Sequence, residues 1–556
     1  MENIKNFLSK GWLLSLLFSL PAAWALFVPG FFGASDDMHI AWLYEMDRAV
    51  KMGQIPPRFV PDLSFGFGYP LFNFVFPLPF YIGEAFHLLG LGFVDSIKAV
   101  FFVSIPVSAI CMYLFLREFT SKWLSLAGAL LYVYTPYRAT DLYVRGAIGE
   151  IVSFATLPVI ALSIIKLTDE KEYSLRWVGF GAVALSSLVL SHNITAFMVI
   201  PFIFLLGFLR FFQITRKIKI FGRLILTFFL GLLISSYFWV PAIVDSVLMK
   251  EDTVFNFADH FPTFRQLFTP SWGYGASVPG PYDGMSFFLG LINIIVLIVG
   301  VLAIFLFWKK YNPNQKIILV WAFFSFIVSI FMMNYRSSFI WHNFPLLPYF
   351  QFPWRFLIMT TFIIPVFFVC FKQIKFQNII ACMLVFLAVI LNIGNFRPHD
   401  FLGRGDNYYI NRYIPIPFAS SEYLTLAEEY LRLPKVAESR PDRNYPLISL
   451  NNGTAEILRN DNNLNIYIET SSSEDMILNY NKYFFPGWKA ALDSSETEIF
   501  AGAPFGQINV KIPPGNHKLE IKFGETPLKV MLDIFGVTAL LVAVFLIVKY
   551  GALKKT

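Results

Sequence analysis

Long apolar runs separated by short polar links make up most of the chain. Each run holds roughly 20 residues, the length of an α-helix that crosses the hydrocarbon core of a bilayer. The pattern therefore predicts a polytopic α-helical membrane protein. The runs fall at about 11–32, 71–92, 97–117, 122–136, 147–167, 174–191, 193–212, 219–241, 285–308, 316–333, 354–372, 376–393 and 528–549.

The polar links between the runs carry an orientation signal, because lysine and arginine concentrate in cytoplasmic links. These links can share one side of the membrane only if the run 71–92 does not cross it. Pro77, Pro79 and Gly83 interrupt that run, which makes it a poor continuous span. We therefore expect about twelve crossings, a re-entrant or interfacial segment at 71–92, and both termini in the cytoplasm. The basic links are "REFTSK" (117–122), "KLTDEKEYSLR" (166–176), "RFFQITRKIKIFGR" (210–223), "WKKYNPNQK" (308–316), "KQIK" (372–375) and "KYGALKKT" (549–556).

The pattern changes between residues 394 and 527. After a helical piece at 420–434, short runs alternate between apolar and polar residues and are separated by turn clusters, as in strands of a β-sandwich. We expect a transmembrane domain at 1–393 with a first external loop at 33–70, then an extracytoplasmic, mostly-β, sandwich-like domain at 394–527. A final transmembrane helix and cytoplasmic tail follow at 528–556. The alternating runs are "AEILRN", "LNIYIETS", "DMILNYNKYF", "GQINVKIP" and "HKLEIKFG".

Composition agrees with this architecture and excludes several functions. The 556 residues are 56% hydrophobic and 15% charged, and the net charge of +7 fits basic cytoplasmic links rather than nucleic-acid binding. The sequence has no Walker-type phosphate loop to drive transport with ATP. Charges within the runs are few, whereas an ion-coupled transporter usually places some at the bilayer midplane.

The first external loop opens with two adjacent carboxylates, Asp36 and Asp37, followed closely by His39. Ionisable residues at the mouth of a membrane segment are functional candidates. One carboxylate could act as a general base while the other orients its neighbour, or Asp36 could cap the helix that begins here. Together with His39 the pair could bind a divalent metal such as Mg²⁺ or Mn²⁺; otherwise His39 packs beneath the helix.

The stretch 53–81, "GQIPPRFVPDLSFGFGYPLFNFVFPLPFY", is rich in glycine, proline and aromatic residues. It cannot form a simple helix. It is either a bed for a long isoprenoid or acyl chain or ordinary aromatic packing at the membrane interface. Arg58 and Asp62 within it are spaced to pair with each other.

Two arginines stand where a span begins. Arg145 in "PYRATDLYVRGAIGE" (136–150) and Arg355 in "QFPWRFL" (351–357) have the side chain suited to bidentate phosphate contacts. The alternatives are an ion pair of Arg145 with Asp141 or Glu150, and snorkelling of Arg355 to lipid phosphates.

A tight connection between two spans carries the polar pair His192 and Asn193 in "SHN". The pair could line a ligand pocket. Alternatively, it satisfies the unpaired backbone groups of two helix ends.

These features together resemble known families. The acidic pair in the first external loop, the many spans and the external C-terminal domain resemble the GT-C superfamily of integral membrane glycosyltransferases. "SDDMHIAWL", "PYRATDLYVRGAIGE", "SHNITA" and "FQFPWRFL" resemble prokaryotic membrane proteins called 6-pyruvoyl-tetrahydropterin synthase-related. The end, "YFFPGWKAALD…GQINVKIPPGNHKLEIKF", resembles YfhO-type membrane proteins. Pterin synthase chemistry itself is not expected, because it needs clustered zinc-binding histidines and the seven histidines here are scattered.

The GT-C resemblance implies an inverting transfer of a sugar from a polyprenyl-phosphate donor to a glycan, lipid or protein acceptor of the cell envelope. The reaction would take place on the outer face of the plasma membrane. The resemblance implies that Asp36 or Asp37 is the base or a metal ligand. Arg145 and Arg355 would bind the lipid phosphate, with Arg58 as a third candidate. His192 and Asn193 would line the pocket. The alternatives are a non-catalytic translocator of lipid-linked glycans and an envelope-glycan assembly or binding protein.

Overall fold

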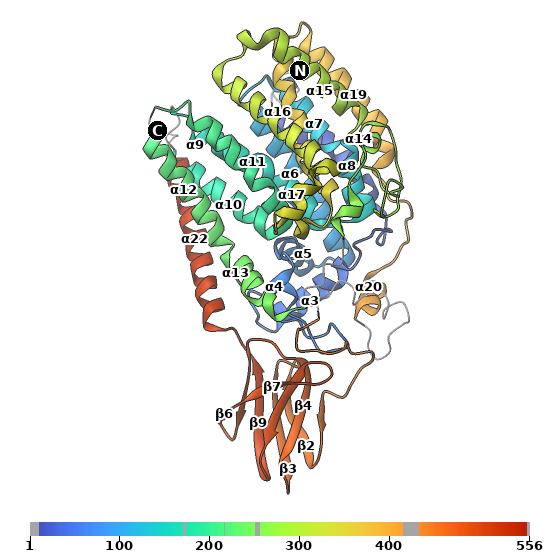
Figure 1. Cartoon of the computed structure of the whole chain (residues 1–556), viewed down its shortest axis with the longest axis vertical. Helices are drawn as coiled ribbons and strands as arrows, with labels where there is room; N and C mark the ends of the chain where they lie inside the picture. Colours follow the sequence, from blue (N-terminus) through green and yellow to red (C-terminus); the bar gives the residue numbers. More distant parts are fainter. Residues whose placement is uncertain (1–9, 171–173, 216, 251–255, 415–432, 553–556) are drawn as a thin grey trace.

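The computed structural model describes residues 10–170, 174–215, 217–250, 256–414 and 433–552. A large helical part stands above a smaller β part (Figure 1). The principal helical elements are α2 (Gly11–Ser19), η1 (Leu20–Phe27), α3 (His39–Lys51), α4 (Leu71–Phe74), α5 (Leu78–Leu88), α6 (Phe93–Leu116), α7 (Lys122–Val133), α8 (Pro136–Ala139), η2 (Thr140–Arg145), α9 (Ile148–Leu167), α10 (Arg176–Ser191), α11 (Asn193–Phe211), α12 (Lys217–Ile234), α13 (Ser236–Val244), η3 (Asp245–Leu248), α14 (Phe264–Phe268), α15 (Leu291–Phe307), α16 (Pro313–Met333), α17 (Ser338–Asn343), η8 (Pro353–Phe356), α18 (Leu357–Ile363), η9 (Ile364–Gln373), α19 (Gln377–Asn392), α20 (Asp406–Tyr413) and α22 (Pro527–Ala552).

Most predicted crossings are helices of the expected kind. Among the described residues, eight helices are long and apolar enough to cross a membrane, or up to nine if α12 and the following bent segment, which meet at 67°, form one span. The apolar helices Gly11–Phe27, Lys122–Val133 and Arg176–Ser191 are shorter. The chain is therefore a polytopic helical membrane protein, and about twelve crossings remains a prediction.

The run 71–92 is not a continuous helix. It divides into α4 and α5, and both are far shorter than the roughly 20 residues that a span needs. Pro77 lies at the break, where its ring and missing N–H would disrupt a continuous helix. The predicted interruption is therefore present, and a re-entrant course through a membrane remains a prediction.

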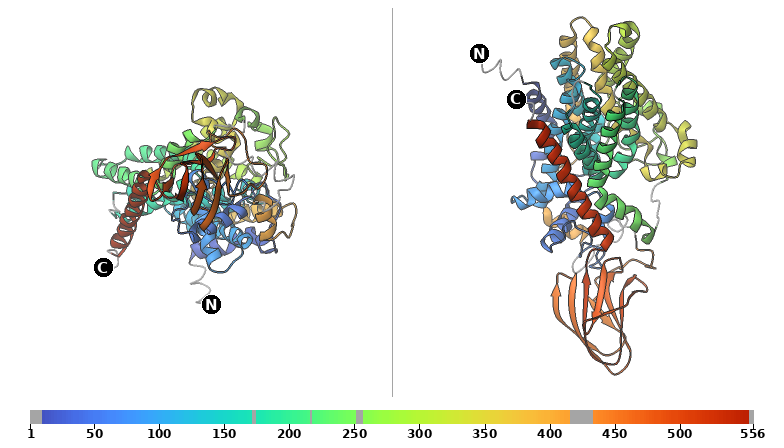
Figure 2. Two further views of the ribbon diagram at one scale, coloured as in Figure 1. Left: turned by 90° about the horizontal axis from the view of Figure 1, so that it is seen from below. Right: turned by 90° about the vertical axis from the view of Figure 1, so that its left-hand side faces the viewer.

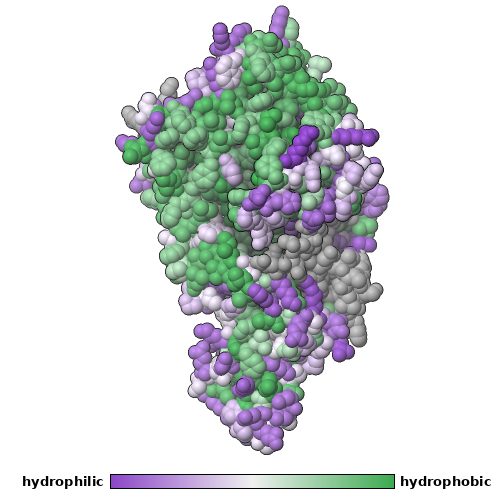
Figure 3. Space-filling view, viewed as in Figure 1, coloured by the Kyte–Doolittle hydropathy of each residue, from purple (hydrophilic) through white to green (hydrophobic). Residues whose placement is uncertain are grey.

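On the face shown in Figure 3, apolar residues cover most of the helical part, whereas polar residues gather along its top and right edges and over much of the β part. Large side chains point outward from several helices, including Phe305 at 78% exposure and Phe386 at 65%. An exposed apolar surface of this extent is expected for a lipid-facing protein.

The β part consists of two antiparallel sheets. One has four strands in the order β1-β4-β8-β7 and the other has five in the order β2-β3-β9-β5-β6. Trp488 of β5 is 5% exposed and its ring lies 5.6 Å from that of Tyr480 in the other sheet, so this tryptophan is part of the core between the sheets. The strands are β1 (Ile448–Leu450), β2 (Thr454–Asp461), β3 (Asn465–Ser472), β4 (Met476–Tyr483), β5 (Trp488–Leu492), β6 (Ser495–Thr497), β7 (Ile499–Gly502), β8 (Gln507–Ile512) and β9 (Gly515–Phe523).

Each predicted alternating run coincides with a strand, since alternation places one face of a strand in the core. The buried pattern of β3, in which Ile466 and Ile468 are buried on one face, is an example. The helix predicted at 420–434 falls almost entirely outside the described residues.

The β part contacts the helical part through the loop between α3 and α4. Lys482 of β4 is fully buried, and its Nζ donates to the carbonyl oxygens of Pro61, at 2.9 Å, and Gly66. The backbone N–H of Tyr483 donates to the carbonyl of Phe67 at 2.9 Å. From this junction α22 runs back along the helical part (Figures 1 and 2).

Candidate functional site

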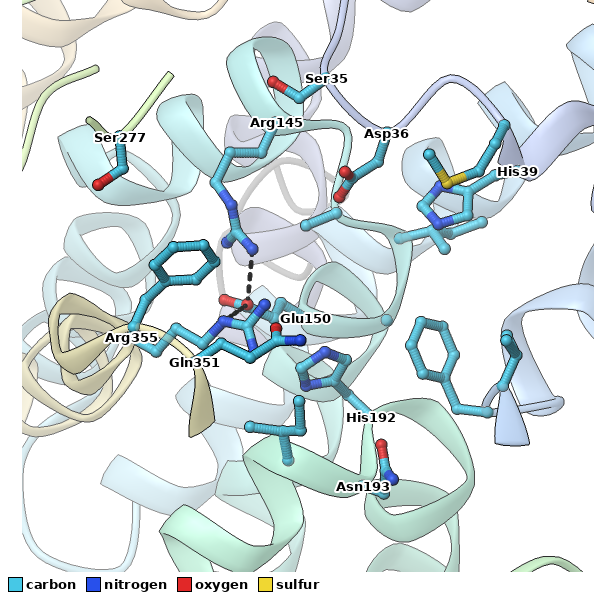
Figure 4. Close-up of a pocket in the computed structure, with 18 of the residues that line it drawn as sticks. Ser35, Asp36, His39, Arg145, Glu150, His192, Asn193, Ser277, Gln351 and Arg355 are labelled. Carbon is cyan, nitrogen blue, oxygen red and sulfur yellow. Dashed lines mark hydrogen bonds and ion pairs between the residues drawn. The ribbon is translucent and has the colours of Figure 1, made fainter. Parts of the chain in front are cut away.

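A cavity of about 540 Å³ lies within the helical part, beside the starts of α3, α9 and α11. Its walls come from segments that are far apart in the sequence (Figure 4). The predicted residues that line it are Asp36, His39, Arg145, His192, Asn193 and Arg355. Asp37 and Arg58 are not among the residues that line this cavity.

The backbone of the first loop is held against the segment that precedes α9. The N–H of Ser35 donates to the carbonyl of Val144 at 3.1 Å, and the N–H of Asp36 donates to the carbonyl of Arg145 at 2.8 Å. Gly146 makes this approach possible, because its φ of +71° is in the left-handed region and an added Cβ would lie 3.0 Å from the Cβ of Ala34.

The two adjacent carboxylates point to different surroundings. Asp36 is half-buried and faces the cavity, whereas the carboxylate of Asp37 accepts a hydrogen bond from the hydroxyl of Tyr413 on α20. Asp36 is not a helix cap, since α3 begins after Met38 without a side-chain cap. Burial raises the pKa of the Asp36 carboxyl, and the positive charges of Arg145 and Arg355 oppose that rise.

The two arginines converge on Glu150 at the start of α9. The Nη2 of Arg145 donates to Oε1 of Glu150 at 3.0 Å, and the Nε of Arg355 lies 3.4 Å from the same oxygen. The Tyr137 hydroxyl donates to Oε2 at 2.8 Å, and Arg145 also pairs with Asp141. The predicted ion pairs of Arg145 therefore form, but in a buried cavity wall rather than on the surface.

Arg355 keeps hydrogen-bonding capacity for a ligand. It is only 8% exposed and lines the cavity, so the snorkelling alternative is wrong. Its Nη1 donates to the carbonyl of Phe350 at 3.2 Å, while its Nε has no hydrogen-bond partner among the described residues. Arg145 is oriented by the ring of Trp354, whose centroid lies 4.8 Å from the guanidinium carbon.

His192 lines the cavity and also caps a helix end. It precedes α11, and its Nδ1 accepts a hydrogen bond from the N–H of Thr195 at 3.2 Å, which satisfies the helix end. Burial lowers the pKa of His192 to about 3, so the ring is neutral and carries its proton on Nε2. Asn193 beside it is exposed.

The predicted metal ligands do not come together. Asp36 and Asp37 diverge, and the His39 ring packs 5.5 Å from Trp42 and 5.8 Å from Phe80, as the packing alternative expected. Burial lowers the pKa of His39 to about 3. No group of three or more His, Cys, Asp or Glu residues suited to a metal ion occurs in the part of the chain that the structure describes. The donor set therefore does not fit the predicted Mg²⁺ or Mn²⁺.

Arg58 lies at the junction with the β part instead of in the cavity. Its side chain is 2% exposed and pairs with Glu525 and Asp533, each at 2.7 Å. The expected pair with Asp62 is wrong, because Asp62 pairs with Arg48 at 3.1 Å. Arg58 therefore ties the first loop to the start of α22.

Sequence reasoning did not identify several residues of the cavity wall. Ser277 comes from the long loop before α15, and its hydroxyl donates to Asp283 at 2.7 Å. Gln351 has a φ of +66°, unusual for a residue other than glycine. Trp42 and Trp354 supply apolar faces. Only the tertiary arrangement of the segments that carry these residues brings them to the site.

The fold and this cavity together define the class of the protein. It is a polytopic membrane protein with a charged pocket among its helices. Residues 72–397 match the sequence model of the 6-pyruvoyl-tetrahydropterin synthase related domain, described as a membrane protein. Because the match covers more than half of the chain, the protein belongs to this family. An uncharacterized protein of Lactococcus lactis subsp. cremoris (strain MG1363) is 23% identical over 351 residues, 60% of this chain. The chain covers 55% of the length of that relative.

Proposed function

We propose that the protein is an inverting membrane glycosyltransferase that takes a sugar from a polyprenyl-phosphate donor. The observation that carries the proposal is the meeting of Asp36 with Arg145 and Arg355 in one cavity. A base and cationic phosphate-binding groups are the two requirements of such a transfer. The walls formed by Trp42 and Phe76 suit an amphipathic donor.

In the proposed reaction, Asp36 accepts the proton of an acceptor hydroxyl group. The hydroxyl oxygen forms a bond to the anomeric carbon as the bond from that carbon to the phosphate oxygen breaks. The electron pair of the broken bond stays on the lipid phosphate, which Arg355 and Arg145 stabilise and to which His192 Nε2 can donate. Attack opposite the leaving group inverts the anomeric carbon.

The two carboxylates take different roles in this proposal. Asp36 is the base, since it faces the cavity. Asp37 holds the loop through Tyr413 and makes no contact with the reacting atoms. Arg58 is assigned to the junction with the β part rather than to the substrate, because both of its ion-pair partners, Glu525 and Asp533, belong to the C-terminal region.

The cavity is placed on the outer face of the plasma membrane in this proposal, with both termini cytoplasmic and the β part extracytoplasmic. The positions of the basic links in the fold support this orientation. The basic links join the ends of α6, α9, α11 and α15 to the helices that follow, at the ends remote from the cavity. Basic residues favour the cytoplasmic side, so the cavity is expected to face outward, toward an acceptor of the cell envelope.

The test uses purified protein in liposomes with a panel of radiolabelled polyprenyl-phosphate sugars and envelope-derived glycan, lipid and peptide acceptors. Labelled product, or slow hydrolysis of one donor without acceptor, supports the proposal. Transfer should continue in EDTA, because arginines provide the positive charge. No transfer and no hydrolysis with any donor, despite donor binding, would favour a translocator or an envelope-glycan binding protein.

A further inference from the structure

A second cavity, of about 640 Å³, lies across the first loop from the one described above. The two cavities share Ser35, and Gly275 of the second is followed in the chain by Ala276 of the first. Ser35, Gly275 and Ala276 thus form a common rim. The residues that line the second cavity are Gly33, Ala34, Ser35, Tyr143, Val144, Tyr274, Gly275, His399 and Asp400.

The walls of the second cavity are fixed by backbone contacts. The N–H of Gly33 donates to the carbonyl of Asp400 at 3.1 Å, and the N–H of Phe31 donates to that of Arg404 at 2.8 Å. The ring of Tyr274 meets the His399 ring edge-on, with centroids 5.1 Å apart. The segment after α19 and the loop before α15 therefore meet against the same loop that carries Asp36.

The two cavities differ in the ligand chemistry that they offer. The first has two arginines, whereas the second has no arginine or lysine in its lining. The second offers the half-buried ring of Tyr274, the Ser35 hydroxyl, and the His399 imidazole paired with Asp400 at 2.7 Å. Aromatic rings pack against the C–H face of a sugar, and a carboxylate accepts hydrogen bonds from its hydroxyl groups. The carboxylate of Asp400 would repel a phosphate, because no arginine or lysine in the lining offsets its charge.

We propose that the second cavity binds the acceptor, a neutral glycan whose terminal sugar lies against Tyr274 and Asp400. This inference rests on the proposed function, in which Asp36 takes the proton of an acceptor hydroxyl. The terminal hydroxyl group crosses the rim at Ser35 to reach Asp36. The anionic donor and the neutral acceptor thereby approach the same carboxylate from opposite sides of one loop.

The test is binding of an array of neutral gluco-, galacto-, manno- and rhamno-oligosaccharides to the full-length protein in lipid nanodiscs. Wild type should bind at least one of them, and Tyr274→Ala should weaken that binding about three- to tenfold, the worth of one aromatic contact. Asp400→Asn should also weaken it, and its side chain is 62% exposed, so the variant should fold. Tyr282→Ala is the matched control, because Tyr282 belongs to the same loop, is 87% exposed and does not line either cavity.

The outcomes separate this inference from the proposed function. Glycan binding that depends on Tyr274 but comes with no transfer from any donor would support the second cavity and refute the glycosyltransferase. Transfer in which Tyr274→Ala and Asp400→Asn leave the acceptor KM unchanged would refute the acceptor cavity and leave the enzyme standing. Binding to no glycan, or binding lost equally in Tyr282→Ala, would also overturn the inference.

Discussion

The backbone N–H of Asp36 donates a 2.8 Å hydrogen bond to the carbonyl oxygen of Arg145. This contact fixes the first loop directly against the segment that supplies a cationic wall of the cavity. The proposed base and a proposed phosphate-binding residue are therefore positioned by the same backbone pairing. Changes that separate the two backbones should impair catalysis even when both side chains are retained.

Gly146→Ala tests that pairing. The substitution places a Cβ 3.0 Å from the Cβ of Ala34 at a φ of +71°, and the left-handed conformation alone costs about 1–2 kcal/mol. We expect a lower thermal midpoint and a loss of transfer. Gly222→Ala is the control, since an added Cβ there meets nothing within 4 Å. Equal transfer by both variants would show that the loop contact is dispensable.

Arg355 is expected to act on the donor. Arg355→Ala removes a buried guanidinium from the phosphate site and should raise the donor KM by about 30-fold or more. Arg355→Lys keeps the charge without the planar guanidinium fork and should be intermediate. Arg336→Ala, an exposed arginine in the same loop that does not line the cavity, should leave the KM unchanged. If Arg355→Ala has the same donor KM as wild type, Arg355 does not bind the donor phosphate.

The pH dependence of transfer should report Asp36. Burial raises its pKa, and a base must be ionised to accept a proton. As the pH is lowered, the transfer rate should therefore begin to fall at a higher pH than it would for an ordinary aspartate, whose pKa is about 4. Burial lowers the pKa of His39 and His192 to about 3, so neither should contribute an inflection near the ordinary imidazole value of about 6.5. A single inflection there, abolished in His192→Gln, would point to a histidine base.

Lys482 should stabilise the contact between the β part and the first loop. Lys482→Met leaves the carbonyl oxygens of Pro61 and Gly66 without their buried donor. The free energy of unfolding should fall by about 1–3 kcal/mol, measured by denaturation in detergent. Lys489→Met, at an exposed position of β5, should change it by less than about 0.5 kcal/mol. If the two variants unfold alike, the Lys482 contacts contribute little.

Patterns local in the sequence predicted most of the fold. The apolar runs became helices because lipid-facing and core positions both require apolar residues. The alternation in "LNIYIETS" predicted β3, since Ile466 and Ile468 share one buried face. Pro77 likewise marked the break between α4 and α5.

The candidate site was predicted in part. Asp36, Arg145, His192 and Arg355 were identifiable because each is a polar residue next to an apolar run. The separation of Asp37 from Asp36 was not predictable, because it depends on Tyr413, far along the chain. The same holds for Arg58 and its partners in the C-terminal region, and for wall residues such as Ser277. Tertiary contacts, rather than local pattern, decide which charged residues share a cavity.

The central claim is that Asp36 alone of the acidic pair is the base. The most direct measurement compares transfer from the active polyprenyl-phosphate sugar by wild type, Asp36→Asn and Asp37→Asn in liposomes, with folding checked by thermal midpoint. We expect Asp36→Asn to lower the rate by about 10²–10⁴-fold, the usual contribution of a general base. Asp37→Asn should lower it by less than about tenfold, since its amide oxygen can still accept from Tyr413. Loss of transfer in Asp37→Asn with Asp36→Asn still active would contradict the account.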